Sequence, residues 1–269
     1  RAGMTITNGV ATAIAPPDAN TDLKYYYSQN MALHYLLTGD ERYREAAEAV
    51  SAKVATMWNP QYDGADRFWT ERHAGFALLA HEWALMVTDD QAATISARAE
   101  ADVTAYLAGQ AAYPSTYSDA NARCFAHTAA AAGESFGYTG CSPWLSAILA
   151  DALDQYARRV GGTRAAQVKD SLARLGRIIA RDGRDTTGKP FYWMGVGTTS
   201  DEVDGYDEHW GEPAYVIALA YAATGKTEPA LKTAADQLIA GLAANGVVGQ
   251  TRSFNWQCRS AVMTPALLK

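Results

Sequence analysis

The side chains of this 269-residue chain that can move protons or bind charged groups gather in a few short stretches. The densest is DEVDGYDEHWGEP (201–213), which holds six acidic residues, a histidine and two aromatic residues. A second is ERH (71–73), and a third is SDANARCFAH (118–127). Imidazoles and carboxylates act as general acids and bases, and arginine binds carboxylates. The stretches are therefore candidate site segments, although Asp207 and Glu208 could simply favour the start of the following helix.

Two reactions suit these residue types. In β-elimination from a uronic-acid polymer, the sugar carboxylate is neutralised, a histidine or tyrosine removes the C5 proton, and an acid protonates the leaving oxygen. The candidates for these roles are His73, His209, Tyr206, Tyr138, Arg72, Asn121 and His127. In glycoside hydrolysis, two carboxylates flank the bond. Glu71 or Asp66 could then work with Asp207 or Asp204.

Aromatic residues accompany the same stretches. A flat ring with a polar edge can pack against the apolar face of a sugar. The predicted substrate-binding residues are Trp69, Trp144, Trp193, Trp210, Trp256 and Tyr62, with Arg67 beside them. The alternative is that these rings fill the top of a helical core. Their number and the charges around them favour a binding surface.

The elements that must position these residues are almost all helices. Apolar residues recur at three- and four-residue spacing, which predicts amphipathic helices. The expected ranges are 22–38, 41–58, 73–88, 91–110, 143–160, 164–181, 208–223 and 228–244. Strand signal is confined to short pieces such as FYWMGVG (191–197), and SAVMTPALLK at the end of the chain predicts the start of another helix.

The helices form pairs joined by tight turns that contain Gly or Asp, such as LLTGDERY (36–43) and AATGKTEP (222–229). If each tight turn joins the first helix of a pair to the second, the long connections all lie at the opposite end. Those connections are 59–72, 111–142, 182–207 and 245–257, and the candidate residues lie in them or within a few residues of them. The pattern predicts one site at the end of the array where the long connections meet.

Composition restricts the function further. The net charge of −6 argues against a nucleic-acid partner, and no apolar run reaches the roughly 20 residues of a membrane span. Of the three cysteines, Cys124 and Cys141 flank a long loop and could pair, or all three could be free thiols. The chain opens on Arg1, as expected for a trimmed product, and we expect a secreted or periplasmic protein. CxxC and HExxH spacings are absent, which argues against a structural zinc or zincin site, and we name no metal ligands and no cofactor.

Four helix pairs carry a family resemblance. The phrases are YYYSQNMALHYLLTGDERYREAA (25–47), RHAGFALLAHEWALMVTDDQAA (72–93), SPWLSAILADALDQY (142–156) and DEHWGEPAYVIALAYAATGK (207–226). They resemble the helix pairs of (α/α)-toroid carbohydrate-active enzymes, most of all polysaccharide lyases of heparinase II/III-like or alginate-lyase-like type. The resemblance spans about residues 20–245 and rests on the repeat, since no diagnostic catalytic motif matches. It implies a groove for a polysaccharide and a catalytic set of Asn or Gln, His, Tyr and Arg.

We therefore predict an all-α array of antiparallel helical hairpins, an (α/α) toroid, complete or incomplete, in a single domain over 1–269. Residues 1–20 are expected to form an irregular arm, and 246–269 a loop and helix. The predicted function is a polysaccharide lyase, with a toroid glycoside hydrolase as the first alternative. A non-catalytic glycan- or protein-binding scaffold is the second alternative. The sequence does not determine the oligomeric state.

Overall fold

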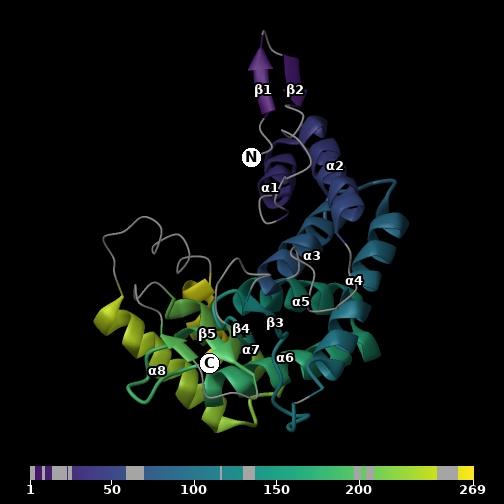
Figure 1. The fold of residues 1–269 in the computed structure, drawn as a ribbon. Helices are drawn as coiled ribbons and strands as arrows, with labels where there is room; N and C mark the ends of the chain where they lie inside the picture. Colours follow the sequence, from purple (N-terminus) through teal and green to yellow (C-terminus); the bar gives the residue numbers. More distant parts are fainter. Residues whose placement is uncertain are drawn as a thin grey trace. The chain divides into compact units, whose positions relative to one another are not determined.

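The computed structural model describes residues 4–7, 10–13, 23, 26–58, 70–115, 117–129, 137–196, 201–203, 209–246 and 260–269. Most of the described chain is helical (Figure 1). The principal helices are α1 (Gln29–Thr38), α2 (Glu41–Met57), α3 (Glu71–Leu85), α4 (Ala92–Ala112), α5 (Ser146–Val160), α6 (Gly162–Asp182), α7 (Gly211–Ala223) and α8 (Pro229–Asn245). A 3₁₀ turn, η3 (Ala261–Met263), leads into α10 (Thr264–Leu268). The eight predicted helices and the predicted C-terminal one are thus present.

The chain divides into two compact units. The first consists of Arg1–Asn59 and Phe76–Ala101, and the second of Pro60–Gly75 and Asp102–Lys269. The single domain expected from the sequence stays a prediction. Among the described residues, no helix has both the length and the apolar character that crossing a membrane requires.

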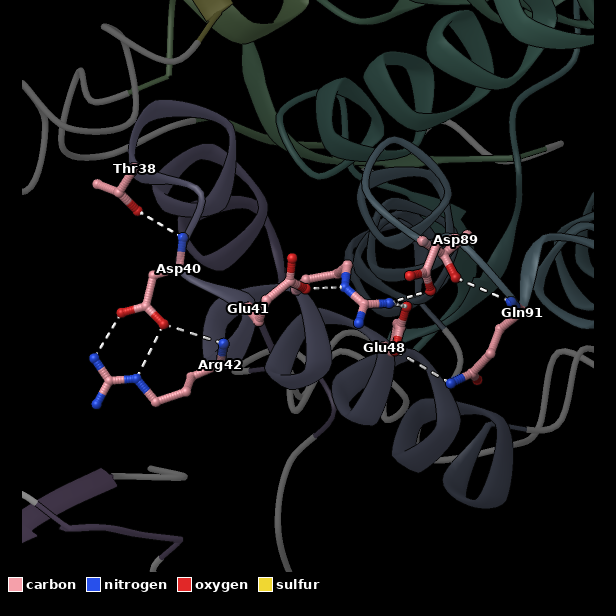
Figure 2. A network of polar contacts seen from close by, with 9 residues as sticks. Thr38, Asp40, Glu41, Arg42, Glu48, Asp89 and Gln91 are labelled. Atoms are coloured by element: carbon pink, nitrogen blue, oxygen red, sulfur yellow. Dashed lines mark hydrogen bonds and ion pairs between the residues drawn. The ribbon is translucent and has the colours of Figure 1, made fainter.

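In the first unit, the α1–α2 pair is joined by a tight turn of the predicted kind. Gly39 ends α1 with φ of 70°, a left-handed conformation that glycine adopts without steric cost. Asp40 then caps α2, because its side chain accepts a hydrogen bond from the backbone N–H of Arg42 at 3.1 Å. Further along α2, Arg44 donates to Glu41 and to Asp89, and lies 3.4 Å from Glu48 (Figure 2).

We had expected an irregular N-terminal arm over residues 1–20, but its described part forms two strands. Strands β1 (Met4–Thr7) and β2 (Val10–Ala13) pair antiparallel, with Thr7 opposite Val10. The chain holds β-branched residues on both sides of Asn8-Gly9, a dipeptide typical of hairpins. Helix α1 also begins later than predicted, at Gln29.

In the second unit, α5 and α7 are buried while α6 and α8 each keep an exposed side. Residues 211–220 of α7 are all buried, as its nearly continuous apolar sequence requires. Helix α6 packs against α5 and α7, and α7 packs against α8. The approach of α6 to α7 is close, since a Cβ built on Gly176 would lie 2.1 Å from the Cβ of Ala220.

The second unit also holds a four-stranded antiparallel sheet, with two strands before α5 in the chain and two between α6 and α7. Its order is β3 (His127–Thr128), β4 (Thr139–Cys141), β5 (Phe191–Gly195) and β6 (Asp201–Val203). Only β5 is close to a strand expected from the sequence. Because β3 and β4 come from one long connection and β5 and β6 from another, the sheet joins these two connections. Within the second unit this confirms that long connections meet.

Candidate functional site

The first turn of α3 carries the ERH stretch. Thr70 precedes the helix, and its Oγ1 accepts from the backbone N–H of His73 at 3.3 Å, which caps the helix start. The same hydroxyl lies 2.6 Å from Nδ1 of His73. This cap holds the His73 ring and leaves Glu71 in the first turn, where the helix dipole favours a carboxylate. Thr70, Glu71 and His73 are all buried.

Glu71 pairs with His127 from strand β3. Oε2 of Glu71 lies 2.5 Å from Nε2 of His127, and Oε1 accepts from the backbone N–H of Ser142 at 2.8 Å. Nδ1 of His127 lies 2.9 Å from the carbonyl oxygen of Thr128. A carbonyl oxygen can only accept, so Nδ1 carries a hydrogen. A hydrogen bond between Oε2 of Glu71 and Nε2 of His127 then requires one proton, which either of the two atoms can carry.

The sheet explains how His127 reaches Glu71. His127 stands opposite Gly140 of β4, and Gly140 stands opposite Gly195 of β5. A Cβ at Gly140 would lie 2.3 Å from the carbonyl oxygen of Met194, so only glycine permits this spacing. The ring of Trp193 meets that of His127 edge-on, with centroids 4.9 Å apart. A disulfide between Cys124 and Cys141 links the segments before β3 and at the end of β4.

The start of α7 supplies a second imidazole–carboxylate pair. Nδ1 of His209 lies 3.2 Å from Oε1 of Glu212, and both residues are only 1% exposed. The His209 ring stacks on Trp144, with centroids 4.3 Å apart and planes 8° from parallel. The guanidinium carbon of Arg72 lies 5.6 Å from the Trp144 ring centroid. Trp144 thus connects this pair to the first turn of α3.

Helix packing holds the two pairs in place. A Cβ at Gly75 would lie 2.7 Å from backbone atoms of Ile148 and Leu149, so α3 and α5 approach closely one turn beyond Glu71. Further along, the Tyr215 hydroxyl of α7 donates to Asp151 of α5 at 3.0 Å. Burial, and next the negative charge of Asp151, raise the pKa of Tyr215, so its hydroxyl stays a donor.

We call the buried set Glu71, His73, His127, Ser142, His209 and Glu212 the polar layer. It contains three histidines and two carboxylates, none more than 4% exposed. Burying such groups is costly unless they are hydrogen-bonded, and each histidine here has a hydroxyl or carboxylate partner. Buried titratable groups concentrated at helix N-termini are typical of a catalytic site.

The structure brings together Glu71, Arg72, His73, His127 and His209 of the predicted catalytic residues. Asn121 is exposed, and its carbonyl oxygen accepts from Arg177 of α6, so it lies apart from the polar layer. Tyr138 is half-buried next to β4. The other predicted residues lie outside the described part of the chain: Tyr206, Asp207, Asp66, Asp204, Trp69, Trp256, Arg67 and Tyr62.

The described tryptophans differ from the surface that the sequence suggested. Trp144, Trp193 and Trp210 are 2%, 0% and 5% exposed. Their rings pack against His209, against His127, and beneath Gly241 of α8, respectively. In these positions the rings support the polar layer and the helices, as in the alternative of core filling, although part of Trp210 also lines a hollow between α6 and α8.

The sequence assigned no role to Thr70 or Ser142, and it placed Glu212 in the acidic stretch 201–213 without a specific role. Thr70 stands three residues before His73 and Glu212 three after His209, spacings that place side chains together at a helix start. These two could have been found. The backbone N–H of Ser142 has no sequence signal, because its partner Glu71 is 71 residues away.

Carboxylate oxygens also gather in the first unit. One oxygen each from Glu48, Asp89 and Asp90 lies within 4.8 Å of the others, a spacing that could hold a cation. Arg44 contacts both Glu48 and Asp89, however, so a guanidinium already supplies positive charge there (Figure 2). We assign no metal to this cluster.

No family model and no curated protein matches the chain. Two solved structures are similar. One is UGL with dGlcA-Glc-Rha-Glc, at 15% identity and a TM-score of 0.56, covering 90% of this chain and 61% of that one. The other is the unsaturated glucuronyl hydrolase from Bacillus sp. GL1, described as responsible for the degradation of glycosaminoglycan. It has 12% identity, a TM-score of 0.53, and covers 99% of this chain and 78% of that one.

At these identities the likeness establishes the fold. The chain has the mostly helical, hairpin-based fold class of (α/α)-toroid proteins, as the sequence predicted. It spans 61% of the length of the first structure, less than two thirds.

Proposed function

We propose that this chain is a carbohydrate-degrading enzyme that hydrolyses glycosidic bonds in uronate-containing saccharides. The observation that carries the proposal is the Glu71–His127 contact of 2.5 Å at the start of α3. A similar fold in two solved structures, one an unsaturated glucuronyl hydrolase and one carrying a saccharide, supports the choice of substrate class. The proposal replaces our first expectation of a lyase by the alternative of a hydrolase.

Hydrolysis needs a proton delivered to the leaving oxygen and a carboxylate that activates water or attacks the sugar. We assign the role of general acid to the Glu71–His127 pair, whose hydrogen bond contains the proton to be delivered. The Ser142 N–H holds Glu71 in position and Thr128 fixes the His127 tautomer. Asp207 or Asp204 remains the expected second carboxylate, and both lie outside the described residues.

Elimination requires an imidazole or phenol base that reaches the sugar. In the polar layer, Nδ1 of His73 contacts the Thr70 hydroxyl, Nδ1 of His209 contacts Glu212, and both nitrogens of His127 have acceptors or donors within 2.9 Å. The carboxylates paired with imidazoles favour hydrolysis, since that reaction depends on carboxyl groups. The Cys124–Cys141 disulfide supports a secreted or periplasmic location, where disulfides persist.

One assay separates the reactions. The protein is incubated with saturated uronate oligosaccharides, with oligosaccharides that end in an unsaturated uronate, and with neutral oligosaccharides. Reducing ends and ultraviolet absorbance are followed together. Hydrolysis releases reducing ends from a uronate substrate without new absorbance. New absorbance from saturated substrates would instead establish elimination, and the absence of both signals on all substrates would favour a binding protein.

A further inference from the structure

A groove between α6 and α8 in the second unit lies apart from the polar layer. It consists of two adjoining hollows of about 560 and 410 Å³. Arg181, Arg184 and Gln237 line both hollows. Ala180, Ala230, Ala234, Ala240 and Gly241 are also among the lining residues on the two helices, and their small side chains leave space between them.

The arginines in this groove differ in their partners. Arg177 donates twice to Glu228, at 3.0 and 2.6 Å, and Arg181 donates to Asp182 and Asp119. Within the described part of the chain, the acceptors of Arg184 are both neutral: Oε1 of Gln237 at 2.8 Å and the carbonyl oxygen of Ala180 at 3.2 Å. Arg184 is half-buried, and this burial lowers the pKa of its guanidinium.

The other charged residues that line the groove have charged or hydrogen-bonding partners close by. Asp185 also lines the larger hollow, but its Oδ1 accepts from the backbone N–H groups of Thr187 and Lys189 and from the Thr187 hydroxyl. Three arginines and two carboxylates line the two hollows together, so the lining carries one net positive charge. A partly desolvated guanidinium with neutral partners gains a charge-assisted hydrogen bond when a carboxylate arrives.

We propose that this groove is an accessory site for the carboxylate of an acidic saccharide, with Arg184 as the carboxylate-binding residue. Thr186, Thr187, Gln237 and Asn245 line the larger hollow and supply donors and acceptors for hydroxyl groups. Trp210 lines the same hollow and directly follows His209 of the polar layer in the sequence. The choice of a sugar acid rests on the proposed function, whereas the carboxylate site itself does not.

The test follows ligand binding through a signal from Trp210, which lines the larger hollow. The indole N–H signal of Trp210 in a nitrogen–proton correlation spectrum, assigned with Trp210→Phe, is followed while sodium glucuronate, glucose or sodium acetate is added. We expect glucuronate to shift the signal in a saturable way and glucose to leave it unchanged. Acetate should compete weakly, because it supplies the carboxylate but no hydroxyl groups. Equal binding of acetate and glucuronate would overturn the saccharide assignment.

Variants test the role of Arg184. Arg184→Gln should weaken glucuronate binding at least tenfold, and Gln237→Glu should do the same by placing a carboxylate on the guanidinium. Arg174→Gln is the matched control, since Arg174 is on α6 but pairs with Asp170. Unchanged affinity in both groove variants would refute the proposal. A glucuronate response that depends on Arg184 would stand even if the chain hydrolyses nothing, so the two proposals fail separately.

Discussion

At the scale of single residues, the proposed reaction depends on the proton between Glu71 and His127. Glu71→Gln keeps the shape of the side chain and removes the exchangeable proton. We expect kcat on uronate oligosaccharides to fall by about 10²- to 10⁴-fold, the usual contribution of acid–base catalysis. Glu41→Gln, at an exposed carboxylate that pairs with Arg44 far from any histidine pair of the polar layer in the sequence, is the control. Lower thermal stability with unchanged kcat would assign Glu71 a structural role instead.

A second residue-scale prediction concerns His81 in the first unit. Its Nδ1 lies 2.8 Å from the Ser51 hydroxyl, and burial, with the nearby charge of Arg98, lowers the pKa of His81 to about 4 from 6.5. The unfolded chain therefore binds a proton at a higher pH than the folded chain does. The stability due to neutral His81 is complete above pH 6.5 and is lost as pH falls toward about 4.

The loss amounts to about 3 kcal/mol of unfolding free energy. His81→Asn should remove this dependence, which urea denaturation at several pH values will measure. His34→Asn, at a partly exposed histidine of α1, serves for comparison. An identical slope in the wild type and the His81 variant between pH 4 and 6.5 would contradict the prediction.

At the scale of elements, the stability of the second unit depends on the close packing of α6 against α7. Gly176→Ala would place a methyl group against the Cβ of Ala220, and the helices would have to separate. We expect a loss of about 1–3 kcal/mol in unfolding free energy, as for other overpacked interiors. Gly137→Ala, where no atom lies within 4 Å of the added carbon, should change stability little. Chemical denaturation of the two variants distinguishes these effects.

The disulfide is the second feature at the scale of elements that we expect to stabilise the fold. Cys124 and Cys141 are 17 residues apart, and their bond restricts the unfolded chain around β3 and β4. Replacing both by Ser should lower the free energy of unfolding by about 3 kcal/mol. Because β3 holds His127, the double variant should also lose activity at temperatures where the wild type is stable. Activity and stability identical to the wild type would show that the sheet holds this geometry without the bond.

At the scale of the whole molecule, the net charge of −6 opposes a polyanionic substrate. On the proposed function, each uronate beyond the bound units adds repulsion from this net negative charge. We therefore expect short acidic oligosaccharides to have lower KM than long polymers at low salt. Added salt screens the repulsion and should narrow that difference. Measuring KM against chain length at two ionic strengths checks this, and a preference for long chains that salt abolishes would contradict it.

The sequence by itself determined the helices, because their signals are local. Apolar spacing placed α2, α5 and α8 within a few residues of their observed bounds, and Gly and Asp marked their tight turns. Alternation of helix and connection also predicted that long connections meet, which β3, β4 and β5 confirm within the second unit.

Only the tertiary structure decided which groups pair. Glu71 meets His127 across 56 residues, through a sheet whose short strands β3 and β4 lack a local signature. It also decided that Trp144 and Trp193 are buried against histidines, where the sequence suggested a sugar-binding surface. Helix formation depends on neighbours three and four residues away. Pairing and burial depend instead on how distant segments fold back on one another, and a side chain's type and position in the sequence do not record that.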